Sequence, residues 1–158
     1  MTLGMAGNAG AAEPTPLGVF NDWTAYTYKA ADTKVCYVVS QPKASEAAKK
    51  VKRDPIFFLV THMPGRRING EISTIIGYPF KESTTAQLKV NAAEFVLFTN
   101  GDGAWADTTE KEKQIVAAMK AGQTFSVTGT SWKGTETIDH YSLSGFSAAM
   151  DKIDAACK

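Results

Sequence analysis

Apolar and polar side chains alternate over much of the chain, which is the pattern of β-strands packed on one face. The first such stretch covers residues 19–28, where the odd-numbered and the even-numbered positions both include aromatic or β-branched side chains. Residues 56–61 differ because they form an apolar run bounded by prolines at positions 55 and 64. That run predicts a central, fully buried strand. The remaining predicted strands cover residues 34–40, 69–77, 86–90, 94–99, 124–130 and 135–142.

A first helix is predicted over residues 108–121. Asp107 is expected to cap it, with Glu110 three residues on in the arrangement of a capping box. Its apolar stripe consists of Ile115, Val116 and Met119. Gly122 follows as the residue just past the helix end.

A second helix is predicted over residues 144–156, with Ser144 at its start. Four side chains repeat at spacings of four, three and four positions, which places them on one face. These are Phe146, Met150, Ile153 and Cys157. That face turns Cys157 toward the core.

Strands joined by short turns, without intervening helices, predict antiparallel pairing. We therefore expect a mainly β fold, an antiparallel β-sandwich or strongly curved barrel with one inserted helix and a C-terminal helix. Residues 42–54 form a polar insert and are expected to be a long loop.

The length of 158 residues fits one domain, which we place at residues 13–158. With 44% hydrophobic and 21% charged residues, the composition is that of a globular protein. A formal net charge of +1 argues against a strongly basic nucleic-acid binder. No segment has the roughly 18 consecutive apolar residues of a membrane-spanning helix, so we predict that the domain is not transmembrane.

Residues 1–12 carry no charge and are mostly small. Ala9, Gly10 and Ala11 fit the small-x-small rule of a signal-peptidase site. One interpretation is the remnant of a secretory signal that starts upstream of Met1, and the other is a disordered tail. Under the first interpretation the mature protein begins near Glu13.

Cys36 and Cys157 are 121 positions apart, far outside any metal-binding or redox motif. In an exported chain they predict one disulfide that ties an early strand to the C-terminus. The alternative is two buried free thiols.

A Ser-His-Asp hydrolase needs a nucleophile beside a base. Ser147 follows Gly145 as in half of a nucleophile elbow, but Ala149 replaces the closing glycine. Asp139 and His140 are neighbours on a predicted strand and therefore face opposite ways. We expect no catalytic residues.

No metal or cofactor site is predicted. The turn at residues 100–103, with Asp107 nearby, is rich in oxygen but lacks the spacing of an EF-hand loop. Two histidines and two distant cysteines do not make a zinc site. Gly101 and Gly103 lack the continuation of a phosphate-binding loop.

Basic side chains gather in and after the polar insert, and they predict a binding patch for phosphates, anionic glycans or lipid headgroups. The alternative is a solvated loop. Because no aromatic side chains are interleaved, single-stranded nucleic acid is disfavoured. The patch would consist of Lys49, Lys50, Lys52, Arg53, Arg66 and Arg67, with Lys43 at its start.

Three tryptophans, Trp23, Trp105 and Trp132, are candidates for lining a ligand pocket. In an all-β domain such residues more often belong to the core or its rim.

Six segments together resemble the invasion-associated locus B family of exported alphaproteobacterial proteins. They are FNDW (20–23), VCYVVSQP (35–42), RDPIFFLVT (53–61), IIGYP (75–79), FVLFTNGD (95–102) and YSLSGF (141–146). The resemblance implies a β-sandwich-like periplasmic or envelope-associated protein, of a family linked to bacterial entry into host cells, particularly erythrocytes, without a defined enzymatic activity. With two cysteines the chain looks like a short branch of that family, which supplies no active-site residues.

We therefore expect a non-enzymatic, periplasmic or secreted protein that binds an envelope or host component, with outer-membrane association as a further expectation. The first alternative is a β-sandwich module for a small ligand or glycan, and the second is a hydrolase using Ser147.

Overall fold

The computed structural model describes residues 13–158, which form one antiparallel sheet with two α-helices. The strand order is β1-β2-β3-β5-β6-β9-β8-β7-β10-β11-β4. The strands are β1 Thr15–Phe20, β2 Trp23–Ala30, β3 Thr33–Ser40, β4 Ala44–Ala47, β5 Phe57–Met63, β6 Ile68–Ile75, β7 Thr85–Val90, β8 Ala93–Asn100, β9 Gly103–Trp105, β10 Thr124–Thr130 and β11 Glu136–Ser142. The helices are α1 Thr109–Ala121 and α2 Phe146–Ala156, with a 3₁₀ turn at Pro64–Arg66. The predicted fold class, mainly antiparallel β with an inserted and a C-terminal helix, is confirmed.

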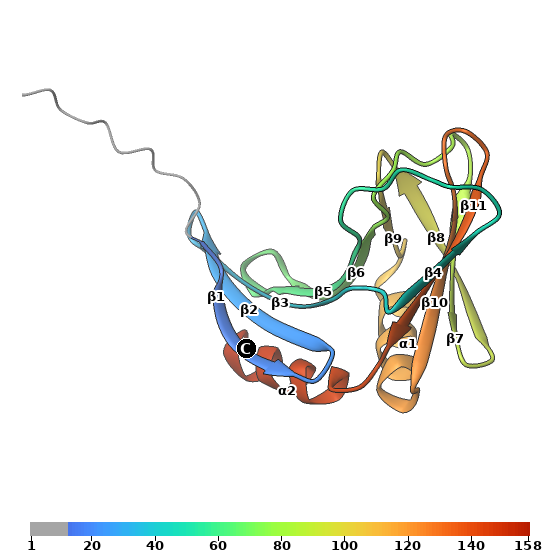
Figure 1. The fold of residues 1–158 in the computed structure, drawn as a ribbon. Coiled ribbons are helices and arrows are strands. Elements are labelled where there is room, and N and C mark those ends of the chain that lie inside the picture. Colours follow the sequence, from blue (N-terminus) through green and yellow to red (C-terminus); the bar gives the residue numbers. More distant parts are fainter. Residues whose placement is uncertain (1–12) are drawn as a thin grey trace, which may run out of the picture.

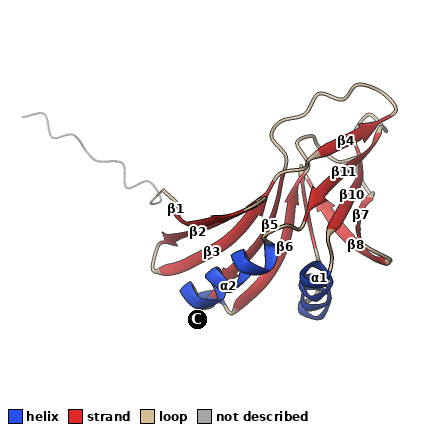
Figure 2. Ribbon diagram, turned by 60° about the horizontal axis from the view of Figure 1, so that its bottom comes forward, coloured by secondary structure: helices blue, strands red, loops and turns tan. Residues whose placement is uncertain are grey.

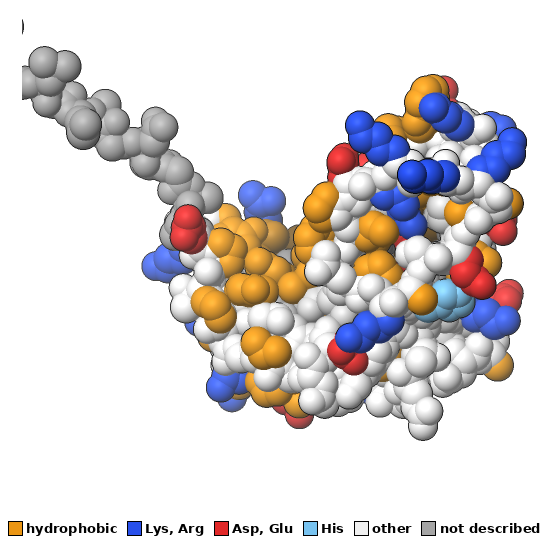
Figure 3. Space-filling model, in the orientation of Figure 1, with side chains coloured by type: hydrophobic (Ala, Val, Ile, Leu, Met, Phe, Trp, Pro, Cys, Tyr) orange, Lys and Arg blue, Asp and Glu red, His pale blue; other side chains and the backbone are white. Residues whose placement is uncertain are grey.

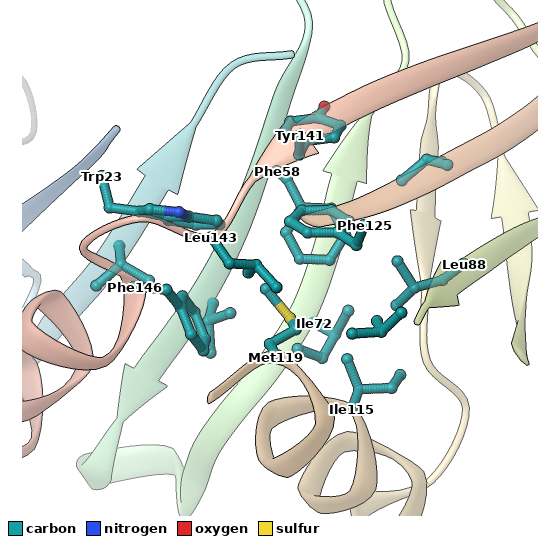
Figure 4. Packing of buried hydrophobic residues seen from close by; sticks show 14 of the residues in the cluster. Trp23, Phe58, Ile72, Leu88, Ile115, Met119, Phe125, Tyr141, Leu143 and Phe146 are labelled. Carbon is teal, nitrogen blue, oxygen red and sulfur yellow. The ribbon is translucent and has the colours of Figure 1, made fainter. Parts of the chain in front are cut away.

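The sheet is strongly bent, so that β1–β3 and the group of β7, β8, β10 and β11 run in different directions (Figure 1). Both helices pack against the sheet, α2 on β1–β3 and α1 on β6, β7 and β8 (Figure 2). The core fills the space between the two parts of the sheet and the helices (Figure 4). Its centre is an aromatic cluster in which Phe58 contacts Phe125 with ring centroids 4.7 Å apart.

The predicted strand at residues 19–28 is two strands. Asn21 has a φ of 53°, in the left-handed region that asparagine tolerates, so the chain turns there and β1 pairs back on β2. Trp23 then begins β2 and is fully buried, and its indole N–H donates to the carbonyl of Ser142 at 2.9 Å.

The apolar run at residues 56–61 forms the central strand β5, between β3 and β6. The prediction that it is fully buried is wrong, because its side chains alternate between buried and half-buried positions. Phe58 and Val60 face the core, whereas Phe57 and Leu59 face outward.

The N-cap of α1 is Thr108 instead of Asp107, and its hydroxyl accepts the N–H of Lys111 at 3.1 Å. Asp107 instead pairs with the ammonium group of Lys111 at 2.8 Å. Gly122 follows the last helical residue, as predicted, in an extended conformation.

Helix α2 begins at Phe146 and is not capped by Ser144. The cap is Gly145, with a φ of 89°, and a Cβ there would collide with the carbonyl oxygen of Phe20. Glycine is therefore required on two counts, backbone conformation and close approach of the β1–β2 turn. The predicted apolar face of this helix, including Cys157, is buried as expected.

The insert at residues 42–54 contains an unpredicted strand. β4 is exposed along its length and pairs with the edge of β11, so that Ser45 lies opposite Asp139. Residues 48–56 then cross back to β5 without regular secondary structure.

No helix in residues 13–158 is both long enough and apolar enough to cross a bilayer. The predicted signal remnant or tail at residues 1–12 lies outside the described residues.

Candidate functional site

A groove of about 760 Å³ lies between the β5–β6 turn, α1 and the C-terminal half of α2. This volume is within the range of about 300–1,000 Å³ that small-molecule sites occupy. We call it the helix groove. Its apolar lining consists of Pro64, Ile68, Val116, Ala117 and Met150.

Four cationic side chains also line the helix groove and are exposed: Arg67 from the β5–β6 turn, Lys113 and Lys120 from α1, and Lys158 from the C-terminus. None of them belongs to an ion pair formed within residues 13–158. Lys111, on the same helix, is by contrast paired with Asp107. The groove therefore contains cationic side chains that form no ion pair within the described residues.

His62 is buried at the side of the groove, and its two ring nitrogens are both engaged. Nδ1 accepts the backbone N–H of Gly70 at 2.9 Å, so the ring proton belongs on Nε2. Nε2 lies 2.6 Å from a carboxylate oxygen of Asp154 on α2 and donates to it. The histidine thus connects β5 and β6 to the last turns of α2.

Glu112 is the other acidic residue of the groove. Its Oε2 accepts the backbone N–H of Ile72 at 3.0 Å, which anchors α1 to β6. Partial burial raises the pKa of this carboxyl, the Ile72 hydrogen bond opposes the rise, and the negative charge of Glu71 adds to it.

The structure contains the predicted disulfide between Cys36 and Cys157, with Cα atoms 6.1 Å apart. Cys36 lies opposite His62 in the pairing of β3 with β5, and Cys157 lines the helix groove. The bond therefore fixes the end of α2 beside the same part of the sheet that carries His62.

Arg53, predicted as part of the basic patch, lies inside the protein. Its guanidinium forms two hydrogen bonds with the carboxylate of Asp139, which is fully buried. It also donates to the carbonyl oxygen of Ile76 and lies over the ring of Tyr78, 5.1 Å from the centroid. These contacts leave it a structural residue, out of reach of a ligand on the surface.

The other residues of the predicted patch are divided between the two ends of β5. Lys49, Lys50 and Lys52 lie in the crossing segment before this strand, while Arg66 and Arg67 lie in the turn after it. A seven-residue strand spans roughly 20 Å. Of these residues only Arg67 lines the helix groove, so the structure does not bring the six together.

The residues of the hydrolase alternative are also apart. Ser147 is exposed in the first turn of α2, and the structure records no hydrogen bond from it to a histidine of residues 13–158. His140 is exposed on β11 and lies 2.7 Å from a carboxylate oxygen of Glu46. Asp139 points to the buried face, so it and His140 face opposite ways as predicted.

Within residues 13–158 no three His, Cys, Asp or Glu side chains gather as a metal site would require. The turn at residues 100–103 joins β8 to β9.

Of the tryptophans, Trp23 is in the core and Trp132 is 60% exposed on the β10–β11 turn. Trp105 stacks on Phe98 with ring centroids 5.6 Å apart.

Apolar side chains also gather on the outer face of the sheet, away from the helices. Tyr26 stacks there on Tyr37 with centroids 5.3 Å apart. Phe98, which is 47% exposed, lies instead with Trp105 in a hollow beside the N-terminal part of α1. Figure 3 shows hydrophobic side chains gathered over the β1–β3 region, beside a hollow in the molecule. Nothing in residues 13–158 forms a second layer over this face.

The helix groove was not predicted from the sequence. Its cations come from three segments whose proximity depends on the tertiary fold. One signal was present, because Lys113, Val116, Ala117 and Lys120 follow the i, i+3, i+4, i+7 spacing of one helix face. That face places an apolar centre between two positive charges.

Comparisons with known proteins agree with one another. Residues 23–154 match the sequence model of the family described as invasion associated locus B (IalB) protein. An invasion protein B homolog of Brucella abortus (strain 2308) is 24% identical over 142 residues, which cover 88% of this chain and 79% of the relative; a homolog from biovar 1 (strain 9-941) gives the same figures. The crystal structure of invasion associated protein b from Bartonella henselae superposes with a TM-score of 0.63 at 17% identity, covering 90% of this chain and 96% of the other.

Proposed function

The chain belongs to the invasion associated locus B family, and from that membership we propose that it is an exported protein that binds a component of the cell envelope or of a host cell and has no catalytic activity. Its place is the periplasm or the exterior of an alphaproteobacterium, with outer-membrane association as part of the proposal. The names of the relatives, which call them invasion proteins, support a role in host interaction.

The observation that carries export is the disulfide between Cys36 and Cys157. Disulfides form and persist in oxidising compartments and are rare in the cytosol, where thiols are kept reduced. In the folded protein this disulfide attaches the end of α2 to β3, so the structure contains the oxidised form of both cysteines.

Cell fractionation combined with thiol labelling tests this part of the proposal. The gene with its native start is expressed in its own host, cells are lysed under denaturing conditions, and a maleimide of large mass is added. We expect the protein outside the cytosol and without a mass shift until a reductant is added. A Cys36→Ser and Cys157→Ser double variant controls for labelling elsewhere. A cytosolic protein with two reactive thiols would contradict export.

The absence of catalysis is proposed because the nucleophile and base of the hydrolase alternative are not assembled. Ser147 lies at an exposed position on α2, and both ring nitrogens of the buried His62 are engaged, Nδ1 by Gly70 and Nε2 by Asp154. Purified protein and a Ser147→Ala variant should both leave a panel of esters and thioesters unhydrolysed. Turnover by the wild type that the variant loses would restore the hydrolase alternative.

The second candidate function is small-ligand binding, and the helix groove is the observation that favours it. An exported protein with such a site would capture its ligand from the envelope or from host material. This candidate and host interaction are compatible, because the groove and the apolar outer face lie on different sides of the sheet.

A further inference from the structure

The helix groove combines two properties, apolar surface and positive charge. It has an apolar centre, formed by side chains such as Ile68, Val116 and Met150, and it has four cations around that centre. An apolar surface in a concave site favours an alkyl or aromatic ligand, whereas the cations favour an acid group.

The acidic residues of the groove do not cancel this positive charge. Asp154 accepts the Nε2–H of His62, and Glu112 accepts the N–H of Ile72. Both carboxylates are thus held by groups of the protein, and the cations of Arg67, Lys113 and Lys120 outnumber them even when both are ionised. The excess charge faces the space that a ligand would fill.

The lining of the groove itself favours an alkyl chain over a glycan. Sugars are usually held by stacking their C–H groups on aromatic faces, whose negative charge attracts polarised hydrogens. The helix groove has no Phe, Tyr or Trp among its own lining residues. The rings of Phe98 and Trp105 line an adjoining hollow that shares Arg67, Ile68 and Lys113 with the groove, and Trp132 lies on the β10–β11 turn. Aliphatic side chains and the methylene stems of lysines are suited to an acyl chain instead.

We propose that the helix groove binds a single-chain anionic amphiphile, with the acyl chain along Ile68, Val116 and Met150 and the acid group among the four cations. This inference rests on the small-ligand part of the proposed function. The shared chemistry is an alkyl chain with one acidic headgroup, and its two sources are a free fatty acid, with a carboxylate, and a lysophospholipid, with a phosphate.

Isothermal titration calorimetry on the full oxidised chain tests this, with every ligand below its critical micelle concentration. The probes are oleate, oleoyl lysophosphatidate and, as a neutral ligand with the same chain, monoolein. We expect oleate, oleoyl lysophosphatidate or both to bind at least about ten-fold more tightly than monoolein. The acid that binds more tightly shows whether the groove prefers a carboxylate or a phosphate headgroup. In a series of saturated fatty acids, affinity should rise by up to about four-fold for each added methylene.

Charge variants locate the site. Lys113→Gln with Lys120→Gln should weaken oleate binding about ten-fold and leave monoolein binding unchanged. The matched control is Lys49→Gln with Lys50→Gln, which removes two exposed charges remote from the groove. It should change neither the affinity for oleate nor the affinity for monoolein. Unchanged unfolding midpoints show that both variants remain folded.

Three outcomes overturn the inference: no binding of either acid, equal binding of oleate and monoolein, or oleate binding that depends on Lys49 and Lys50 and not on Lys113 and Lys120. Each leaves the export proposal standing, because that proposal depends on compartment and thiol state. Conversely, a cytosolic protein that binds oleate in the groove would contradict the export proposal and support the ligand proposal.

Discussion

Arg53 and Asp139 form a bidentate ion pair across 86 positions of sequence, with Nη1 2.6 Å from Oδ1 and Nη2 2.7 Å from Oδ2. The Asp139 side chain is fully buried, and that of Arg53 is 12% exposed. Ser45, on β4, donates a further hydrogen bond to the same carboxylate at 2.7 Å. This cluster attaches the polar insert to β11, which explains how a segment with little apolar surface is held in a defined position.

Removal of Arg53 should therefore destabilise the fold strongly. In an Arg53→Ala variant, the buried carboxyl of Asp139 has only the Ser45 hydroxyl as a partner. The expected loss in free energy of unfolding is about 3–5 kcal/mol, measured by urea denaturation. Lys52→Ala, one position earlier, should stay within about 0.5 kcal/mol of wild type. A loss below about 1 kcal/mol for Arg53→Ala would mean that the pair is not buried.

Truncation of Phe58 tests the centre of the core. This side chain is fully buried on β5 and contacts Trp23, Phe125 and Tyr141. Phe58→Ala should cost about 3–5 kcal/mol through lost burial and the cavity left behind. Phe98→Ala removes the same atoms from a side chain that is 47% exposed, so its cost should be much smaller. Similar losses for both variants would contradict the central position of Phe58.

The strands and helices were predictable where one local signal dominates. Alternation located β7, β8, β10 and β11, and the spacing from Phe146 to Cys157 gave the buried face of α2. The prediction of strands and of their burial failed where neighbouring elements of the fold determine the outcome. β4 is polar and becomes a strand only because the edge of β11 is available to pair with it. The apolar run of β5 indicated complete burial, yet its outward side chains stay half-buried in the part of the chain that the structure describes.

The candidate site was less accessible to sequence reasoning than the fold. The cysteine pair was predictable because two cysteines leave only one possible disulfide. The basic patch was defined by closeness in sequence, and it mixed the buried Arg53 with residues at the other end of β5. Charge along a chain does not distinguish a surface lysine from an arginine paired with a buried aspartate. The helix groove, formed by three separate segments, has no continuous signature in the sequence.

Glu112 should make stability depend on pH. Burial raises the pKa of this carboxyl above its ordinary value of 4.5. The folded state therefore holds the proton to higher pH than the unfolded state, and the free energy of unfolding falls as pH rises from 4.5 through the folded pKa. Glu112→Gln keeps an oxygen for the N–H of Ile72 and removes the buried charge.

The variant should consequently lose less stability than the wild type between pH 4 and pH 7. Urea midpoints at four pH values across this range measure the difference, with Glu82→Gln, an exposed carboxylate remote from the groove, as the control. Parallel curves for wild type and Glu112→Gln would show that this carboxyl is solvated in the folded state.

The disulfide should stabilise both the fold and the helix groove. It closes a loop of 121 positions, for which the loop-entropy relation gives up to about 4–5 kcal/mol. Phe146, Met150 and Ile153 remain in the core without it, so a Cys36→Ser and Cys157→Ser variant should still fold. Its last helical turn would lose the covalent bond to β3 and would keep the hydrogen bond of Asp154 to His62 and that of the Cys157 N–H to the carbonyl oxygen of Ile153.

Two measurements on that variant separate the global effect from the local one. Urea denaturation should show the loss of stability, and wild-type protein treated with reductant should reproduce it. Amide hydrogen exchange should accelerate more at residues 154–158 than at residues 146–150, because only the end of α2 loses its covalent attachment. Since Cys157 and Lys158 line the helix groove, affinity for an acidic amphiphile should fall in parallel. Equal acceleration along the whole helix would mean that the bond stabilises α2 as one unit, and unchanged affinity would mean that the groove does not depend on it.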